Sequence, residues 1–212
     1  DCYQVGPDIA AADALMLRSH KLHDEHIDES VIAVARAGAG VNNIPVADYA
    51  RRGIVVFNTP GANANAVKEL VAAALLLDSR NIFAAMSYVQ SLDEITDSAE
   101  MHKLLEVNKK RFAGSEITGM TLGVVGLGSI GAIVANMALE LGMKVAGFDP
   151  VISVESAWRL SSQIQKMDSL QALVGISDYL TLHIPAIPQT RGLINAEIIG
   201  RCKPGMRLLN FA

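Results

Sequence analysis

The feature that most constrains the fold of this chain is a glycine pattern that directly follows an apolar segment. Residues 121–131 read Thr-Leu-Gly-Val-Val-Gly-Leu-Gly-Ser-Ile-Gly, so Gly126, Gly128 and Gly131 have the spacing GxGxxG. The first glycine permits a tight turn from strand to helix, the second lets backbone approach a phosphate, and the third lets the helix pack closely on the strand. Free N–H groups at the start of that helix bind anions. The segment therefore predicts a phosphate-binding turn.

A helix and a second strand should follow this turn. Lys144–Phe148 reads as a strand that ends in Asp149, 149 − 131 = 18 residues past the last glycine, where about 20 is expected. An acid there accepts hydrogen bonds from the ribose hydroxyls of NAD and repels the 2′-phosphate of NADP. The unit predicts a Rossmann-type site that favours NAD, although the same pattern can hold FAD or a ligand without a redox role. The apolar helix positions are Ile130, Ile133, Val134, Met137 and Leu141, with Asn136 and Glu140 opposite.

Composition excludes several classes of function. The chain has 212 residues, 50% of them hydrophobic, with 22 acidic against 18 basic residues and a net charge of −4. This balance argues against nucleic acid or an anionic membrane as a partner. Cys2 and Cys202 have no metal or disulfide spacing, which favours a reducing, cytoplasmic setting. The longest apolar run, Leu70–Leu77, is far shorter than the roughly 20 residues of a membrane span.

Strand-like and helix-like segments alternate along the whole chain, which is typical of an α/β fold with parallel sheets. In the first part, Ala14–Leu17, Val31–Ala35 and Ile54–Phe57 predict strands. Between the last two we expect a helix that is capped by Asn43, has Pro45 in its first turn and ends at Gly53.

A longer helix is predicted from Ala66 to Gln90, with Asn65 as its cap. The charged stretch Asp93–Phe112 then predicts an exposed helical or irregular arm, either a solvated face or a contact between subunits. Further on, Tyr179–His183 and Arg207–Phe211 predict strands. Two more helix boundaries are expected, with Asp168 and Gln171 as a capping-box variant before one helix, and another helix running from a cap at Asn195 to Pro204 and Gly205.

Several of these stretches together resemble the D-2-hydroxyacid dehydrogenases, over almost the whole chain and in the right order. The resemblance implies a two-lobed α/β enzyme, with a flavodoxin-like substrate lobe in residues 1–64 and a Rossmann-type NAD-binding lobe in residues 65–212. It also implies a hinge helix from Asn65 onward, a homodimer that forms through the arm, and a chain truncated at both ends, so that both lobes are incomplete. The matching stretches are Ala35–Asn43, Gly53–Ala62, Asn65–Leu70, Val124–Asp149 and Leu209–Ala212.

The resemblance also implies roles for particular residues. Arg18 and Arg36 would meet the phosphate of a small phosphorylated 2-hydroxy acid, and the backbone near Ala39 and Gly40 would hold its carboxylate, because small residues expose N–H groups. NAD would lie along a second set of residues. These are Gly126, Gly128, Ser129, Ile130 and Gly131 at the pyrophosphate, Asp149 at the ribose, His183, Ile184 and Pro185 beside the adenine or ribose, and Phe211 and Ala212 beside the nicotinamide.

The family's chemistry uses an arginine, a glutamate and a histidine, and the resemblance places all three beyond Ala212, so no catalytic residue is assigned in this chain. The expected activity of the intact protein is oxidation of 3-phospho-D-glycerate by NAD. Two arginines favour such a dianionic group. Alternatives are a glyoxylate, hydroxypyruvate, lactate or formate dehydrogenase, a dinucleotide-sensing corepressor, or a small binding module. His20, His23 and His26 are spaced three apart, and solvated surface residues are a better interpretation than a metal site.

Overall fold

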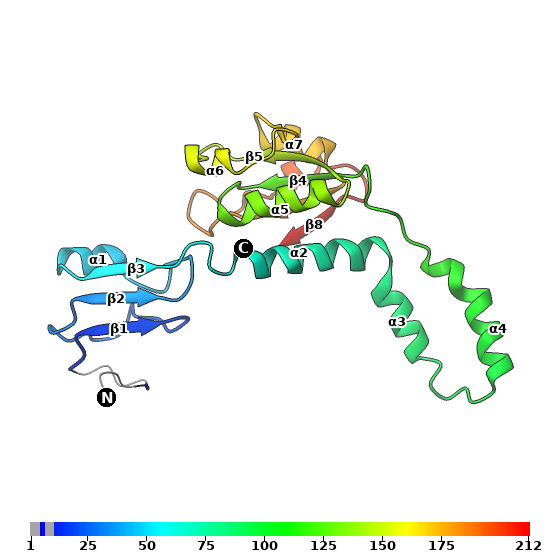
Figure 1. The fold of residues 1–212 in the computed structure, drawn as a ribbon, viewed down its shortest axis with the longest axis horizontal. Coiled ribbons are helices and arrows are strands. Elements are labelled where there is room, and N and C mark those ends of the chain that lie inside the picture. Colours follow the sequence, from blue (N-terminus) through cyan, green and yellow to red (C-terminus); the bar gives the residue numbers. More distant parts are fainter. Residues whose placement is uncertain (1–4, 7–10) are drawn as a thin grey trace. The chain divides into compact units, whose positions relative to one another are not determined.

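The computed structural model describes residues 5–6 and 11–212, and the chain divides into two compact units, Asp1–Ala64 and Asn65–Ala212. The first unit contains a parallel sheet in the order β1-β2-β3, formed by β1 (Ala14–Leu17), β2 (Ala33–Arg36) and β3 (Val55–Asn58). Helix α1 (Val46–Arg51) connects the last two strands (Figure 1). The three strands predicted in this part are confirmed, the second and third with ends shifted by one or two residues.

The start of α1 differs from the prediction. Pro45 occupies the position before the helix, and no side chain caps it. Asn43 is instead buried, and its Nδ2 donates a hydrogen bond to the backbone oxygen of His20 at 2.7 Å. The predicted cap was therefore wrong, because the amide is used to join two loops that are distant in sequence. Gly53 follows the helix end as predicted, with a left-handed φ of +77°.

The second unit is built on a five-stranded sheet in which every neighbouring pair is parallel. The strand order is β6-β5-β4-β7-β8. The chain thus adds β5 and β6 on one side of β4 and then adds β7 and β8 on the other side, so the strand order reverses between β4 and β7. In open α/β sheets ligands bind outside the carboxyl ends of the strands at such a reversal. The predicted α/β class and Rossmann-type sheet are confirmed. The strands are β4 (Thr121–Val125), β5 (Lys144–Phe148), β6 (Gln165–Lys166), β7 (Tyr179–Leu182) and β8 (Arg207–Asn210).

Helix α5 (Ser129–Glu140) follows the glycine turn, as predicted, but its buried face is made of smaller residues than the apolar period suggested. Ile130, Met137 and Leu141 are only partly buried against the core. Small side chains allow the helix axis to approach the sheet closely, which brings the helix start to the strand end. The fully buried positions are Gly131, Ala132, Val134, Ala135 and Ala138.

Two of the predicted helix boundaries in this unit need correction. Helix α7 (Leu170–Ile176) is capped by Ser169, whose side chain accepts from the N–H of Ala172, and not by Asp168. Helix α8 (Ala196–Ile199) is capped by Asn195 as predicted, but it ends at Gly200, well before Pro204. The short helix α6 (Val154–Trp158) lies between β5 and β6.

The single helix predicted over residues 66–90 is wrong. The segment forms α2 (Ala64–Ser79) and α3 (Ile82–Gln90), which are bent by 66° at their break, where Asn81 has a left-handed φ of 52°. Asn65 lies inside α2 and its side chain donates to Glu69, so it is not a cap. Among the described residues no single helix is long and apolar enough to cross a membrane; α2 and α3 reach that length only together.

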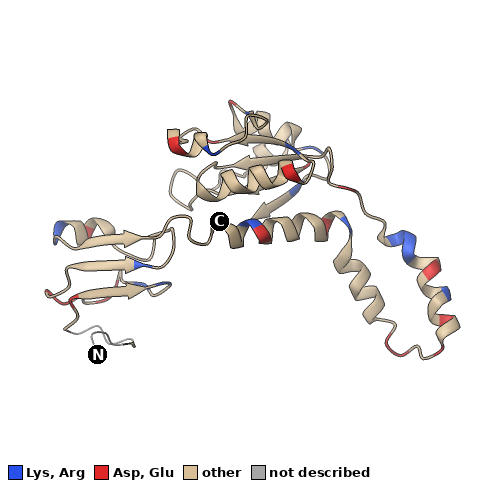
Figure 2. Ribbon diagram, in the orientation of Figure 1, with Lys and Arg blue, Asp and Glu red and all other residues tan. Residues whose placement is uncertain are grey.

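The arm predicted over Asp93–Phe112 contains α4 (Ser98–Asn108) and the short helix η1 (Lys109–Phe112), and α3, which was predicted as part of the preceding long helix, packs against it. From here on the arm denotes residues 82–112. The helical interpretation of its charged half is confirmed, and Figure 2 shows charges gathered on α4 and η1 while α3 carries none. The Tyr88 ring stacks on Phe112 with centroids 5.2 Å apart, and the Tyr88 hydroxyl donates to the carbonyl of Leu104. These contacts join the helices of the arm.

Candidate dinucleotide site

The three glycines of the turn are required for three different reasons. Gly126 has a φ of +85°, and a Cβ there would lie 2.6 Å from the carbonyl oxygen of His183. A Cβ on Gly131 would lie only 1.9 Å from the carbonyl oxygen of Gly126. A Cβ on Gly128, by contrast, would have no atom within 4 Å. The first and third glycines are therefore demanded by the fold, whereas the second leaves open space that a ligand can occupy.

The start of α5 faces that open space. Gly128 precedes the helix, and no side chain caps its first turn. The first N–H groups of an α-helix have no partner inside the helix and carry a partial positive charge. Ser129 and Ile130 begin the helix directly after this glycine. The turn thus offers backbone donors without a competing side-chain acceptor, which suits a pyrophosphate.

Asp149 lies beside the turn and is held in place by two backbone groups. Its Oδ2 accepts from the N–H of Leu127 at 2.8 Å, and its Oδ1 accepts from the N–H of Val151 at 3.0 Å. A carboxylate has about four acceptor positions, so two remain for ribose hydroxyls. The acid after β5 and the turn after β4 are therefore parts of one constellation.

His183 follows β7 and closes the other side of the turn. Its N–H donates to the carbonyl of Val125 at 2.8 Å, and its ring nitrogen Nε2 lies 3.0 Å from the Thr181 hydroxyl. Burial lowers the pKa of His183 to about 4, so the ring is neutral at neutral pH. Ile184 also approaches Gly126, and Pro185 is exposed.

Phe211 and Ala212 follow β8, at the same edge of the sheet as His183, because β7 and β8 are parallel. Phe211 is half-buried against the core, and the N–H of Ala212 donates to the side-chain oxygen of Asn210 at 3.1 Å. The residues predicted for the cofactor thus all lie at the carboxyl edge of the sheet or in the segments that leave it.

In the first unit, Arg18 follows β1 and Arg36 ends β2, opposite Leu17. The Nε of Arg36 donates to the carbonyl of Arg18 at 3.1 Å, so the two predicted positions are joined. The guanidinium of Arg36 lies against the glycine loop, since a Cβ on Gly38 would be 2.7 Å from its Nη1. The structure therefore brings the arginines and the loop of Ala39 and Gly40 to one edge of this sheet.

One contact in this loop was not anticipated from the sequence. Asn58, the last residue of β3, donates from Nδ2 to the carbonyl of Ala39 at 2.7 Å. A polar residue directly at the end of a predicted strand was the available signal.

The three histidines of the first unit do not form a cluster. His20 pairs with Glu25 at 3.1 Å in a segment without regular structure. The helix that would group His20 with His23 and His26 is absent, and the described residues contain no group of three metal-ligating side chains.

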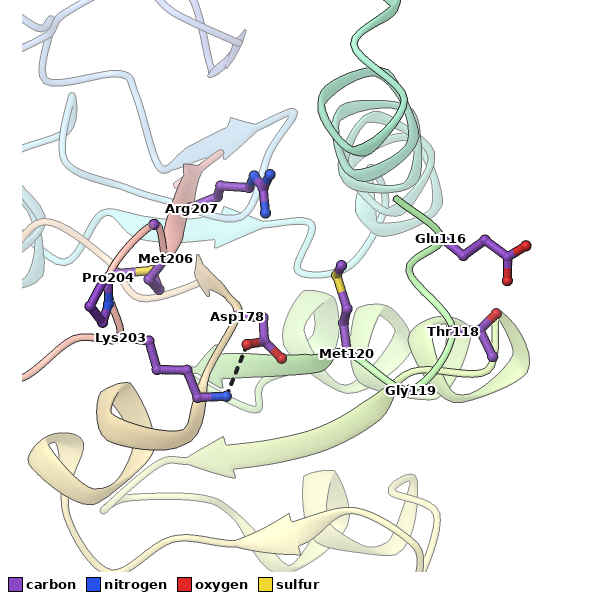
Figure 3. A pocket seen from close by; sticks show the side chains of 10 residues that line it. Glu116, Thr118, Gly119, Met120, Asp178, Lys203, Pro204, Met206 and Arg207 are labelled. Carbon is purple, nitrogen blue, oxygen red and sulfur yellow. Dashed lines mark hydrogen bonds and ion pairs between the residues drawn. The ribbon is translucent and has the colours of Figure 1, made fainter. Parts of the chain in front are cut away.

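A hollow of about 410 Å³ lies at the amino ends of β4, β7 and β8. Two of its charged groups, Lys203 and Asp178, are 2.9 Å apart (Figure 3). Arg207, which also lines it, contacts Asp78 outside the hollow at 2.6 Å. Asp178 also accepts from the N–H of Thr121, and Asp78 accepts from the hydroxyl of Tyr179. These contacts join α2, β4, β7 and β8 at the amino ends of the strands, which is the edge of the sheet opposite the glycine turn.

A parallel sheet that reads 3-2-1-4-5 when its strands are renumbered along the unit, with a glycine turn after the first strand and an acid after the second, defines a dinucleotide-binding Rossmann domain. Residues 82–212 match the profile described as "D-isomer specific 2-hydroxyacid dehydrogenase, NAD binding domain". The chain belongs to this family, and the cofactor of the domain is NAD.

Individual relatives agree with this assignment. The chain is 38% identical over 201 residues to a D-3-phosphoglycerate dehydrogenase of Synechocystis, covering 93% of this chain and 33% of that protein. It resembles the structure of Aquifex aeolicus D-lactate dehydrogenase with NAD and lactic acid, with a TM-score of 0.75 and 25% identity over 96% of this chain and 57% of that one. For the NAD⁺-bound 3-phosphoglycerate dehydrogenase of Entamoeba histolytica the TM-score is 0.69, with 27% identity over 98% and 59%. The chain spans about a third of the length of the curated relatives.

Proposed function

We propose that the protein to which this chain belongs oxidises 3-phospho-D-glycerate to 3-phosphohydroxypyruvate with NAD, the entry step to serine, in the cytoplasm. The observation that carries the proposal is the pair Arg18 and Arg36 at neighbouring strand ends, joined through the carbonyl of Arg18. Two guanidinium groups suit a dianionic phosphate better than the methyl group of lactate. The relatives named D-3-phosphoglycerate dehydrogenase support the same substrate.

In this proposal the first unit is the substrate lobe and the second holds the cofactor. Arg18 and Arg36 bind the phosphate, and the backbone of Ala39 and Gly40 binds the carboxylate. The turn at Gly128 holds the pyrophosphate and Asp149 the ribose. When bound, NAD would accept the hydride from carbon 2 of the acid. No residue of this chain is assigned the transfer of the hydroxyl proton.

Replacing Arg36 by alanine in the full-length protein tests the substrate. We expect kcat/KM for 3-phosphoglycerate to fall by about 100-fold, the loss of a charge-assisted bidentate contact, while the affinity for NAD stays at the wild-type value. Arg51→Ala is the matched control, because Arg51 is exposed and, within the part of the chain that the structure describes, pairs with Asp48 on α1. Equal loss of NAD binding and turnover in Arg36→Ala would contradict the assigned role.

Another 2-hydroxy acid, such as lactate, glyoxylate or hydroxypyruvate, is the second candidate, because the fold also matches the structure of a D-lactate dehydrogenase. Steady-state kinetics with each acid separates the two. A kcat/KM for an unphosphorylated acid that exceeds the value for 3-phosphoglycerate and is insensitive to Arg36→Ala would replace the first proposal.

We also propose that the arm, residues 82–112, contacts a second copy of the chain. Apolar side chains recur every three residues along α3 and are exposed: Phe83 by 65%, Met86 by 52% and Val89 by 55%. Contiguous exposed apolar surface of this kind marks interaction sites. Sedimentation of a Phe83→Asp variant should show a monomer where the wild type is a dimer; a wild-type monomer would end this proposal.

A further inference from the structure

The loop after β2 is fixed from one side by the end of β3. The N–H of Thr59 donates to the carbonyl of Gly38 at 3.0 Å, and Nδ2 of Asn58 donates to the carbonyl of Ala39 at 2.7 Å. The first of these bonds lies beyond the paired residues of the two strands and is displaced by two residues from the ladder, in which the N–H of Val55 donates to the carbonyl of Ile32. The second is made by a side chain, so it depends on the identity of one residue.

Fixing a carbonyl also fixes the N–H of the next residue. A trans peptide is planar, and its C=O and N–H point in opposite directions; the described residues contain no cis peptide. The bond to the carbonyl of Gly38 therefore sets the direction of the Ala39 N–H. The bond from Asn58 to the carbonyl of Ala39 sets the direction of the Gly40 N–H, which points away from β3.

Both of these N–H groups are free to bind a ligand. Within the described part of the chain neither the Ala39 N–H nor the Gly40 N–H donates a hydrogen bond, whereas the N–H groups of Ala37 and Gly38 are both paired. Gly40 is exposed. The guanidinium of Arg36 lies against the same loop, with Nη1 3.6 Å from where a Cβ on Gly40 would be. Two aligned donors beside a cation form a site for a small oxyanion.

We propose that Asn58 is a positioning residue, which holds the peptide between Ala39 and Gly40 so that the Gly40 N–H is presented to the carboxylate of the substrate. The inference rests on the proposed function, because it takes this loop as the carboxylate site. Asn58 itself touches no substrate. Its effect is specific for the carboxylate and does not extend to the phosphate or to NAD.

The test uses Asn58→Asp and Asn58→Ala in the full-length protein. Asn58→Asp keeps the shape of the side chain but replaces the donor by an acceptor that repels the carbonyl of Ala39. Asn58→Ala removes the donor without adding charge. Asn63→Asp is the matched control, because it adds the same charge at an exposed position whose side chain makes no hydrogen bond in the described structure. Thermal melts confirm that the variants are folded, and Asn58→Ala decides the question should Asn58→Asp fail to fold.

Two competitive inhibitors separate the subsites: oxalate as a carboxylate probe and inorganic phosphate as a phosphate probe. For Asn58→Asp we expect KM for 3-phosphoglycerate and Ki for oxalate to rise about tenfold or more, the effect of losing one well-placed hydrogen bond to a charged group. Asn58→Ala should show a smaller rise in the same two constants. Ki for phosphate, Kd for NAD and all constants of Asn63→Asp should keep their wild-type values.

The possible failures are distinguishable. A wild-type protein that turns over no 2-hydroxy acid with NAD overturns the proposed function and this inference with it. A wild-type protein that is active, with Asn58 variants whose KM and oxalate Ki are unchanged, overturns the inference alone. Equal weakening of oxalate and phosphate in Asn58→Asp, with no change in Asn58→Ala, would show a general charge effect and also overturn it.

Discussion

The close packing at Gly131 makes the effect of a single methyl group on the second unit predictable. In Gly131→Ala the new Cβ would lie 1.9 Å from the carbonyl oxygen and 2.9 Å from the carbonyl carbon of Gly126, and 3.4 Å from Val124 Cγ1. Backbone atoms cannot rotate away as a side chain can, so α5 must move off the sheet. Overpacking of this kind costs about 1–3 kcal/mol and occasionally more. Because the obstacle is backbone, we expect about 3 kcal/mol, or a fall in Tm of about 6–12 °C for a domain of this size.

Gly128→Ala is the matched comparison for Gly131→Ala. Its Cβ meets no atom within 4 Å, and the φ of −69° is open to any residue, so Tm should stay at the wild-type value. The methyl group would instead occupy the space in front of the helix start, and we expect Kd for NAD to rise about tenfold or more. Differential scanning calorimetry without cofactor and isothermal titration with NAD measure the two effects. A wild-type Tm for Gly131→Ala, or wild-type NAD affinity for Gly128→Ala, would refute this reasoning.

Two further predictions concern the groups that flank the turn. Asp149→Asn leaves one oxygen to accept hydrogen bonds and removes the charge. We therefore expect NAD affinity to fall about tenfold and NADP affinity to fall less. Isothermal titration measures both affinities, and tighter binding of NADP than of NAD by the wild type would contradict the assignment. The pKa of His183 is lowered by burial from 6.5 to about 4. A lowered histidine pKa gives stability that is present above pH 6.5 and lost as the pH falls toward 4. His183→Gln should therefore lose less stability than the wild type over that window in urea titrations, and parallel curves would exclude the buried neutral ring.

The glycine turn and the strands beside it could be predicted because their signals are local. An apolar run followed by GxGxxG predicts a parallel strand, a turn and a helix start within 11 residues, and Asp149 follows at the distance expected for the acid that contacts the ribose. The break between α2 and α3 could not be found in this way. No proline or glycine interrupts its stretch, and the poor helix formers Ser79 and Asn81 are not sufficient to predict a break. Distant partners hold the chain there: Asn81 donates to the carbonyl of Ala113, and the N–H of Ser115 donates to the carbonyl of Ser79.

In the candidate site, too, local signals could be found in the sequence and long-range contacts could not. That Asp149 lies beside the turn of Gly126 and Gly128 could be predicted from the spacing of the motif alone. The Asn58 contact spans 19 residues and joins the ends of two adjacent strands, so it requires the register of the sheet to be known. The apolar face predicted for α5 does pack against the core, but it was incomplete, because alanine and glycine contribute little to an apolar period and yet allow the closest approach to a sheet.

The contacts of Asp78, Asp178, Lys203 and Arg207 join α2, β4, β7 and β8 at the opposite end of the strands from the residues of this unit that are proposed to hold NAD. The two ends can therefore accumulate mutations independently during evolution. Substitutions at the carboxyl edge can change how the dinucleotide is held without loosening the domain, because the ion pairs at the other edge keep the strands in register. The solved structures named D-lactate dehydrogenase and 3-phosphoglycerate dehydrogenase match this backbone at 25% and 27% identity to the chain.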